Sequence, residues 1–234
     1  MLLTQIKKAV LDILFPPVCA VCGREAETFL CGDCFLSIER NSALHCPLCH
    51  GRIIDLKHLC HPQSLFILGS AGSYDNTVLQ KAIHAFKYQN AKVLAEPLSA
   101  LLIDYLNSLT KNWDLDISDF IIVPIPLHPR RLKERGFNQS LLLANAIGSF
   151  LNLPVVEALR RTKNNKPQVD VKGRLERLKN IADAFSTAAP EAVAKRNILL
   201  IDDVFTSGAT MTEAARVLKT AGAQKIIALV LAKA

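Results

Sequence analysis

Residues 197–210, with the sequence NILLIDDVFTSGAT, decide the fold of this chain. The apolar run within Asn197–Ile201 is short and unbroken, as expected of a strand that is buried in a parallel sheet. Two adjacent acids follow, and then a loop of Thr, Ser, Gly and Ala leads into the helical pattern of residues 209–220, which Gly222 ends. In open α/β sheets ligands bind beyond the carboxyl ends of strands, so this stretch predicts both a sheet and a site.

The chain from residue 65 to residue 234 repeats this alternation of strands and helices. Strands are predicted at residues 65–74, 120–125, 154–158, 197–201 and 225–231. Helices are predicted at residues 78–86, 94–106, 139–151 and 209–220, with weaker periodicity at 175–184. The pattern predicts an α/β domain over residues 65–234, with a mostly parallel sheet and helices on both faces, behind a small cysteine-rich domain at residues 1–64.

The loop after the two acids has the composition of an anion-binding turn. A helix start presents unpaired backbone N–H groups and the positive end of the helix dipole. Gly208 permits a backbone conformation that turns several N–H groups inward. Further donors are the hydroxyls of Thr206, Ser207 and Thr210. Because carboxylates repel phosphate, the two acids suit ribose hydroxyls or a Mg²⁺ ion carried by a pyrophosphate. The alternative is a helix merely capped by Thr206 or Ser207, but capping requires neither two acids nor a glycine.

All seven cysteines lie between residues 19 and 60, and six of them form CxxC pairs. The first set is Cys19, Cys22, Cys31 and Cys34, and the second is Cys46, Cys49 and Cys60. Two CxxC turns complete a tetrahedral structural zinc site. The second set needs a fourth ligand, which His50, His58 or His61 can supply, and a cross-braced pairing of the turns stays open. We therefore expect one or two Zn²⁺ ions, whose binding energy of roughly 10–16 kcal/mol folds most of so small a segment.

The cysteine pattern also indicates the compartment. An odd number of cysteines in tight pairs is untypical of a secreted disulfide framework and typical of metal thiolates in a reducing cytoplasm. Unligated core cysteines are the alternative, and three tandem CxxC pairs argue against it. No segment reaches the ~18–20 unbroken apolar residues of a membrane span. Residues 1–15 place apolar side chains at helical spacing, so we expect an amphipathic helix ended by Pro16–Pro17 and not a signal peptide.

The formal net charge of +7 favours anionic partners such as phosphates, nucleotides or nucleic acid. Residues 128–180 hold twelve Lys or Arg and four Asp or Glu, which is a surplus of +8. From Arg160 onward much of this stretch is polar and short of apolar anchors, which predicts a mobile loop of the kind that closes over active sites. Proteins that bind single strands interleave aromatic residues for base stacking, and few occur here, so only charge supports a DNA interpretation.

Residues 201–210, IDDVFTSGAT, resemble the signature of type I phosphoribosyltransferases that binds 5-phosphoribosyl-1-pyrophosphate (PRPP). The resemblance spans the whole signature without a gap. It implies that the carboxylates of Asp202 and Asp203 contact the ribose hydroxyls of PRPP, which carries Mg²⁺. It also implies a phosphate-binding loop, made of Val204, Phe205, Thr206, Ser207, Gly208, Ala209 and Thr210.

The same resemblance assigns a pyrophosphate site. The buried strand at residues 120–125 is followed by a proline-stiffened turn, which lies where type I enzymes hold pyrophosphate. Arg130 and Arg131 in this turn are expected to make charge-assisted hydrogen bonds to the leaving group, although a solvated basic loop is the alternative. Lys163 or Arg177 is expected to cover the pyrophosphate from the polar loop, with Arg177 as a catalytic residue beside the two acids.

The order of motifs along the chain resembles the ComF/ComFC/GntX family. These motifs are the cysteine module, VPIPLHPRRLKERGFNQS at 123–140, RRTKNNKPQ at 160–168, ERLKN at 176–180 and IDDVFTSGAT. The resemblance implies a phosphoribosyltransferase-like domain fused to zinc knuckles, with a role in natural competence on or near incoming single-stranded DNA in the cytoplasm. One departure is that His61–Pro62–Gln63 follows Cys60, where a final CxxC pair requires a cysteine at position 63.

Two functions are compatible with these features. The first is a phosphoribosyltransferase that binds Mg²⁺–PRPP, passes through an oxocarbenium-like state and transfers the ribose phosphate to a base or amine. The second is a non-catalytic module that senses PRPP or binds single-stranded DNA and recruits a competence helicase or another DNA-processing protein. A purine or pyrimidine salvage enzyme is disfavoured because salvage needs no zinc module.

Overall fold

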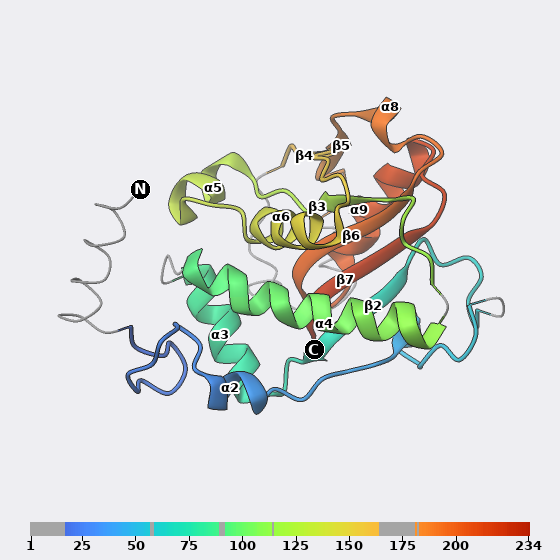
Figure 1. The fold of residues 1–234 in the computed structure, drawn as a ribbon. Helices are drawn as coiled ribbons and strands as arrows, with labels where there is room; N and C mark the ends of the chain where they lie inside the picture. The colour runs from blue at the N-terminus through green and yellow to red at the C-terminus, as the bar shows by residue number, and fades with distance from the viewer. Residues whose placement is uncertain (1–16, 57–58, 89–91, 114, 164–180, 182) are drawn as a thin grey trace.

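Strand β6 (Asn197–Phe205) lies inside the central sheet and carries the acid pair towards its carboxyl end (Figure 1). The computed structural model describes residues 17–56, 59–88, 92–113, 115–163, 181 and 183–234. The other strands are β1 (Leu44–His45), β2 (Ile67–Ser73), β3 (Phe120–Pro124), β4 (Leu159–Arg161), β5 (Phe185–Thr187) and β7 (Ile226–Lys233). The helices are α2 (Gly32–Leu36), α3 (Thr77–Tyr88), η1 (Lys92–Leu94), α4 (Ala95–Trp113), α5 (Pro129–Arg135), α6 (Gln139–Leu151), α8 (Pro190–Val193) and α9 (Ala209–Thr220).

The main sheet has the strand order β1-β2-β7-β6-β3. Strands β2, β7, β6 and β3 are parallel, and β1 pairs with β2 in the antiparallel sense. Strand β3 ends at Pro124, which lies opposite Ile201, whereas β6 continues along β7 to Phe205. Asp202 and Asp203 therefore lie beyond the carboxyl end of β3, where parallel sheets bind ligands.

Helices cover both faces of this sheet (Figure 1). Leu199 and Ile201 of β6 join the core under α3, α4 and α6, while Ile198 and Leu200 join the core that contains α9, β4 and β5. The two cores follow from the alternation of side chains along a strand. Because both faces are covered, the strands are continuous apolar runs and not alternating ones.

The cysteine-rich segment is attached to the sheet through β1. Leu44 pairs with Gly69 of β2 and is fully buried. The hydroxyl of Tyr105 in α4 donates a hydrogen bond of 2.6 Å to the carbonyl of Ala43, next to this strand. The prediction of a mostly parallel α/β sheet flanked by helices, with a small cysteine-rich region before it, is confirmed.

The details differ from the predictions at several points. The predicted strand at residues 154–158 contributes one isolated parallel bridge, between Val155 and Ile122, and the chain then enters β4, which pairs with β5. Strand β6 is longer than predicted because the acids stay in the ladder, with Asp202 opposite Val230. The predicted helix at residues 1–15 and most of the one at 175–184 lie outside the described residues.

Candidate functional site

The acid pair is held by side chains from two helices that are distant in sequence. The Ser140 hydroxyl at the start of α6 donates a hydrogen bond of 2.9 Å to Oδ1 of Asp202, and the backbone N–H of Asp203 donates another of 2.9 Å to the same oxygen. Asn138 caps α6, because its Oδ1 accepts a hydrogen bond from the backbone N–H of Ser140. Lys87 of α3 forms an ion pair with Asp203, with 2.8 Å between Nζ and Oδ1.

Burial and neighbouring charges determine the protonation of Asp202 and Lys87. Burial, and then the negative charge of Asp203, raises the pKa of Asp202 to about 7. Burial on its own lowers the pKa of Lys87, but the charge of Asp203 and the hydrogen bond to it outweigh burial and raise that pKa. Near neutral pH the Lys87 side chain is therefore charged, and the Asp202 carboxyl is divided between its neutral and its charged form. Such carboxylates can accept hydrogen bonds from sugar hydroxyls or bind a hard cation such as Mg²⁺.

The loop after the acids is shaped by one glycine and one aromatic ring. Gly208 has a φ of 76°, and a Cβ atom built on it lies 2.6 Å from Cζ of Phe205. Only glycine fits this left-handed position without moving the buried ring. Helix α9 begins at the next residue, and the N–H of Ala209 donates to Oγ of Ser207 at 3.5 Å. The predicted phosphate loop thus coincides with a helix start that follows a tight turn, which is the local geometry that binds phosphate groups.

Arg161 interacts electrostatically with Asp202 of the acid pair and with a second arginine, Arg131. Arg161 of β4 is 9% exposed, and its guanidinium carbon lies 5.6 Å from the centre of the Phe185 ring. Burial, and then the positive charge of Arg131, lowers the pKa of Arg161 to about 10, while the charge of Asp202 acts in the opposite direction. Among the described residues, neither Nη2 of Arg131 nor Nε of Arg161 has a hydrogen-bond partner, although both atoms are buried. Buried donors without partners favour an anion between them.

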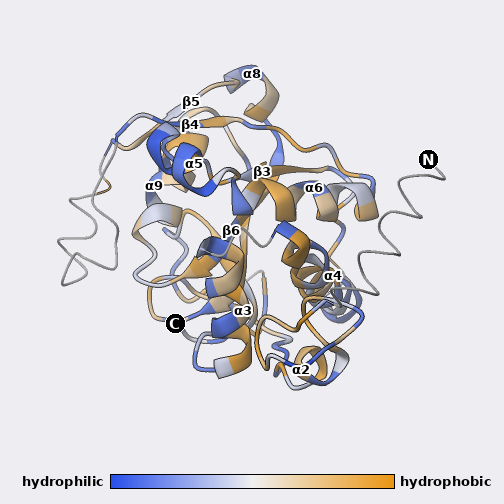
Figure 2. Cartoon of the chain, turned by 90° about the vertical axis from the view of Figure 1, so that its left-hand side faces the viewer, coloured by the Kyte–Doolittle hydropathy of each residue, from blue (hydrophilic) through white to orange (hydrophobic). Residues whose placement is uncertain are grey.

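A cavity of about 400 Å³ lies beside these groups. Its lining is mostly cationic and consists of Lys87, Tyr88, Arg131, Lys133, Glu134, Arg135 and Gly136. Helix α5, which supplies four of these residues, is hydrophilic, in contrast to the apolar strand β3 that precedes it (Figure 2). The guanidinium carbon of Arg135 lies 5.0 Å from the centre of the Tyr88 ring. Because Lys87 reaches both the cavity and Asp203, the cavity opens next to the acid pair.

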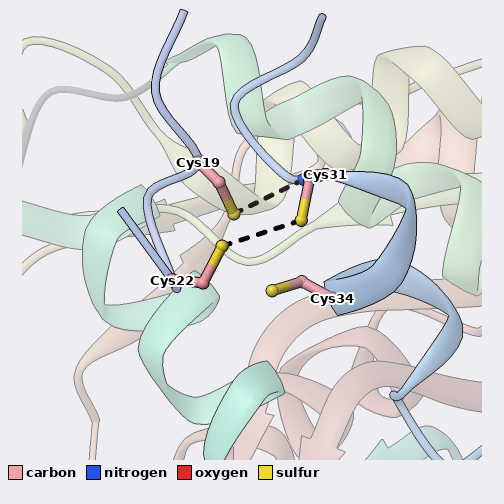
Figure 3. Close-up of side chains that lie close together, drawn as sticks. All are labelled: Cys19, Cys22, Cys31 and Cys34. Carbon is pink, nitrogen blue, oxygen red and sulfur yellow. Dashed lines mark hydrogen bonds between the residues drawn. The ribbon is translucent and has the colours of Figure 1, made fainter. Parts of the chain in front are cut away.

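The first cysteine set forms a cluster with the dimensions of a zinc site. The sulfur atoms of Cys19, Cys22, Cys31 and Cys34 all lie within 4.8 Å of one another and are directed towards a common centre (Figure 3). The 3.8 Å between the Cys22 and Cys31 sulfurs matches the spacing of about 3.8 Å that tetrahedral Zn–S bonds of ≈2.3 Å require. Hydrogen bonds from the backbone and side chain of Arg24 lower the pKa of Cys22 to about 6, which favours the thiolate that zinc needs.

Among the described residues, His61 is the histidine that completes the second cluster. Nδ1 of His61 lies 3.4 Å from the sulfurs of both Cys46 and Cys60, and the sulfurs of Cys49 and Cys60 are 3.6 Å apart. These four ligand atoms again lie within 4.8 Å of one another. The missing cysteine at position 63 is therefore replaced by a histidine directly after Cys60, and the two sets are sequential and not cross-braced. Both donor sets suit a closed structural zinc site, in which all four positions are filled by protein.

Several residues of this site were not foreseen. Arg161 was expected in a mobile stretch, but it is buried in β4, while its neighbour Arg160 is exposed. Arg130, predicted to bind pyrophosphate, is exposed, whereas Arg131 lines the cavity. Arg177 lies outside the described residues, as does His58. Lys87 and Ser140 carry no local signal in the sequence, because only the packing of α3 and α6 brings them to the acids.

Two protein-family models match separate parts of the chain. A double zinc ribbon domain matches residues 10–62, and a phosphoribosyl transferase domain matches residues 138–234. The first match contains both cysteine clusters, and the second contains the acids, the loop and Arg161. The two halves predicted from the sequence thus each resemble a separate known domain.

Full-length relatives combine these two parts. The DNA utilization protein YhgH of Escherichia coli K12 is 32% identical over 212 residues, which cover 89% of this chain and 87% of the relative. The competence protein ComFC of Bacillus subtilis is 30% identical over 203 residues, with coverage of 82% and 79%. The competence protein F of Haemophilus influenzae is 26% identical over 226 residues, with coverage of 93% and 90%. In the described part of the chain, no helix combines the length and the hydropathy that a membrane span requires.

Proposed function

This chain belongs to the ComF family and carries a double zinc ribbon and a phosphoribosyltransferase domain, and on this premise we propose that it binds Mg²⁺–PRPP at the end of β6. The observation that carries the proposal is the acid pair, which Ser140 and Lys87 hold next to a glycine turn and a helix start. The carboxylates of Asp202 and Asp203 accept hydrogen bonds from the ribose 2′- and 3′-hydroxyls. The N–H groups and hydroxyls of residues 204–210 bind the 5-phosphate.

The pyrophosphate of PRPP is assigned to the two arginines beside Asp202. The unpaired donors of Arg131 and Arg161 support this assignment, because a dianion between them relieves their mutual repulsion. Arg130 contributes charge from the exposed side of α5, and Arg177 stays in the proposal as the residue that covers the leaving group. Mg²⁺ would arrive with the PRPP, and the carboxylates of Asp202 and Asp203 could help to hold it; the ion would neutralise part of the developing charge.

Catalysis, in this proposal, is pentosyl transfer by positioning and charge stabilisation. The bond between ribose C1 and pyrophosphate breaks through an oxocarbenium-like state, and a base or amine then attacks C1. The cationic groups stabilise the departing pyrophosphate, while the acids fix the ribose ring. The cavity beside Lys87 is open to an acceptor that carries negative charge.

Calorimetric titrations with ribose 5-phosphate and with Mg²⁺–PRPP test this division of the site. We expect Asp203→Asn to weaken both ligands about 10- to 100-fold, because hydrogen bonds to a charged group are lost from the shared ribose site. Arg161→Gln is expected to weaken only PRPP, by roughly tenfold, because ribose 5-phosphate has no pyrophosphate.

Matched controls are available for both variants. Asp119→Asn removes an exposed acid before β3, and Arg160→Gln removes the exposed neighbour of Arg161. Both are expected to leave the affinities unchanged. Equal affinities of the wild type and Asp203→Asn for ribose 5-phosphate contradict the proposed ribose site.

A role in DNA uptake is the wider context that we propose. Relatives are named for competence and for DNA utilization, and the cation-lined cavity and the charge surplus of residues 128–180 favour an anionic polymer. The protein then acts in the cytoplasm, where zinc thiolates stay reduced, on or near internalised single-stranded DNA. The alternative is a non-catalytic module that senses PRPP or binds single-stranded DNA and recruits a partner such as a helicase.

Salt dependence of binding to a fluorescent oligothymidine tests the DNA role. If six or more phosphates are contacted, the affinity for this single strand is expected to fall about 300-fold or more between roughly 50 and 200 mM salt. Unchanged affinity of Asp203→Asn for oligothymidine is expected if the strand binds outside the ribose site. Undetectable binding at low salt contradicts direct recognition of the strand.

A further inference from the structure

The second cysteine cluster touches the phosphate loop through one aromatic contact. The ring of His50, which directly follows the ligand Cys49, lies with its centre 6.0 Å from that of Phe205 in an edge-to-face arrangement. Phe205 is 2% exposed and also contacts Phe66, at 6.3 Å between ring centres. A side chain of the zinc ribbon therefore packs against the ring on which the glycine turn of the loop rests.

The position of His50 is set by the turn that carries the sulfurs. Its N–H donates a hydrogen bond of 2.9 Å to the carbonyl of Cys46, and the N–H of Cys46 donates one of 2.9 Å to the carbonyl of Gly51. Within this turn His50 has a φ of 60°, in the left-handed region that residues other than glycine rarely adopt. Such a conformation persists only where the surroundings hold it, and two of the cluster's cysteines, Cys46 and Cys49, lie in the same turn.

The other end of the contact is equally constrained. A Cβ atom on Gly208 lies only 2.6 Å from Cζ of Phe205, so the ring directly limits the path of the turn. The carbonyl of Phe205 accepts a hydrogen bond of 2.9 Å from the N–H of Ala234, which fixes the backbone below the ring. The ring thus occupies the space that a side chain at position 208 needs, and a shift of the ring towards the turn displaces the turn.

The first cluster is placed differently. Its buried cysteines, Cys19 and Cys34, belong to the core that contains α3 and α4. Phe205 belongs to the core on the opposite face of the sheet, together with α9. The contact with the loop is thus a property of the second cluster, and the first serves as an internal comparison.

We propose that His50 positions the phosphate loop and thermodynamically links metal occupancy of the second cluster to anion occupancy of the loop. The proposal rests on the proposed function of the loop as a phosphate site. Zinc bound by Cys46, Cys49, Cys60 and His61 would hold the turn at residues 46–51 in place. That turn holds the His50 ring against Phe205. The Phe205 ring in turn keeps the glycine turn at Gly208 in its binding conformation. Linkage of binding free energies is reciprocal, so a phosphate at the loop raises the zinc affinity of the second cluster by the same factor by which zinc raises the affinity of the loop for phosphate.

Zinc release from the wild type tests this linkage without any substitution. The zinc-loaded protein is titrated to equilibrium with a chromophoric chelator, with and without saturating ribose 5-phosphate, and the zinc affinity of each cluster is obtained from the competition. Cys22→Ser identifies which part of the titration belongs to the first cluster, because that variant lacks one ligand of the first cluster. We expect ribose 5-phosphate to raise the zinc affinity of the second cluster about fivefold or more and to leave the zinc affinity of the first cluster unchanged.

Variants of His50 identify the residue that carries the linkage. His50→Asn suits the left-handed conformation, which Asn adopts more readily than most residues, but removes the ring. We expect it to retain both zinc ions, to bind ribose 5-phosphate at least about fivefold more weakly and to lose the protection of the second zinc by that ligand. His50→Phe keeps a ring but suits this left-handed position less well than His, so it is expected to regain only part of the affinity. Phe150→Asn, which removes an exposed ring near the end of α6, is the control and is expected to behave as the wild type.

The outcomes separate this inference from the function on which it rests. Failure of the wild type to bind ribose 5-phosphate overturns the proposed function. Normal binding by the wild type, with zinc release from the second cluster insensitive to ribose 5-phosphate, overturns the linkage alone. Unchanged ribose 5-phosphate affinity in His50→Asn removes His50 from the role.

Discussion

Removal of zinc by a chelator is expected to unfold residues 17–62 while strands β6 and β7 stay folded. Binding of structural zinc is worth roughly 10–16 kcal/mol, which is comparable to the whole stability of an ordinary domain. Apart from the short strand β1 and a few residues that pack on the core with α3 and α4, the segment has little else to hold it. The buried apolar residues in its described part are Cys19, Leu30, Cys34, Ile38, Ala43, Leu44, Cys46 and Ile53. Three of these are cysteines of the clusters, so hydrogen exchange should show loss of protection across the segment when zinc is removed.

Single substitutions separate the two clusters. Native mass spectrometry is expected to find two zinc ions in the wild type and one in either Cys22→Ser or Cys49→Ser, because each variant removes a thiolate from one set. Exchange protection should fall around the affected cluster only. Full protection of residues 17–62 in protein shown to contain no zinc contradicts the assignment of the clusters as structural zinc sites.

Lys87→Met is expected to lower the free energy of unfolding by about 3–5 kcal/mol at about pH 8. The side chains of Lys87 and Asp203 are only 19% and 11% exposed, so the substitution leaves a buried carboxylate without its partner. Asp202 adds to the effect, since its pKa is already raised to about 7 with the lysine present. Removing the lysine charge raises the carboxyl pKa values further. A carboxyl group whose pKa is raised in the folded protein contributes stability at low pH, and this contribution is lost as the pH rises.

Urea unfolding at about pH 5.5 and about pH 8 measures this effect. The loss in Lys87→Met is expected to be smaller at the lower pH, where a proton can replace the lysine. Lys81→Met, on the exposed side of the same helix, is the control and is expected to change stability by less than about 0.5 kcal/mol. A loss in Lys87→Met that is the same at both pH values argues against the buried acid pair as its origin.

Local sequence was sufficient to predict the strand, loop and helix at residues 197–220. The apolar run, the acids and the glycine are neighbours in the chain, and their geometry follows from the strand end and the helix start. The cysteine sets were predictable for the same reason. The choice of His61 over His50 was not, because both lie within reach of the cluster in sequence and only the turn at Cys46 directs the His50 ring towards Phe205.

Residues that reach the site from other elements could not be predicted. Lys87 lies at the end of an amphipathic helix, where a lysine usually faces solvent, and its pairing with Asp203 depends on how α3 packs. Arg161 was hidden in a basic stretch, although the alternation of burial along β4 separates it from Arg160. The positive charges of Lys87 and Arg161 are thus brought to the site by long-range packing, whereas the acids of β6 are recognisable in the local sequence.

Crystals soaked with PRPP and Mg²⁺ test the central claim most directly. The account predicts electron density for the ribose between the Asp202 and Asp203 carboxylates, with the 5-phosphate on the N–H groups of residues 206–210 and the pyrophosphate near Arg131 and Arg161. A glycine turn closed by the protein's own side chains, with no anion at the start of α9, contradicts it.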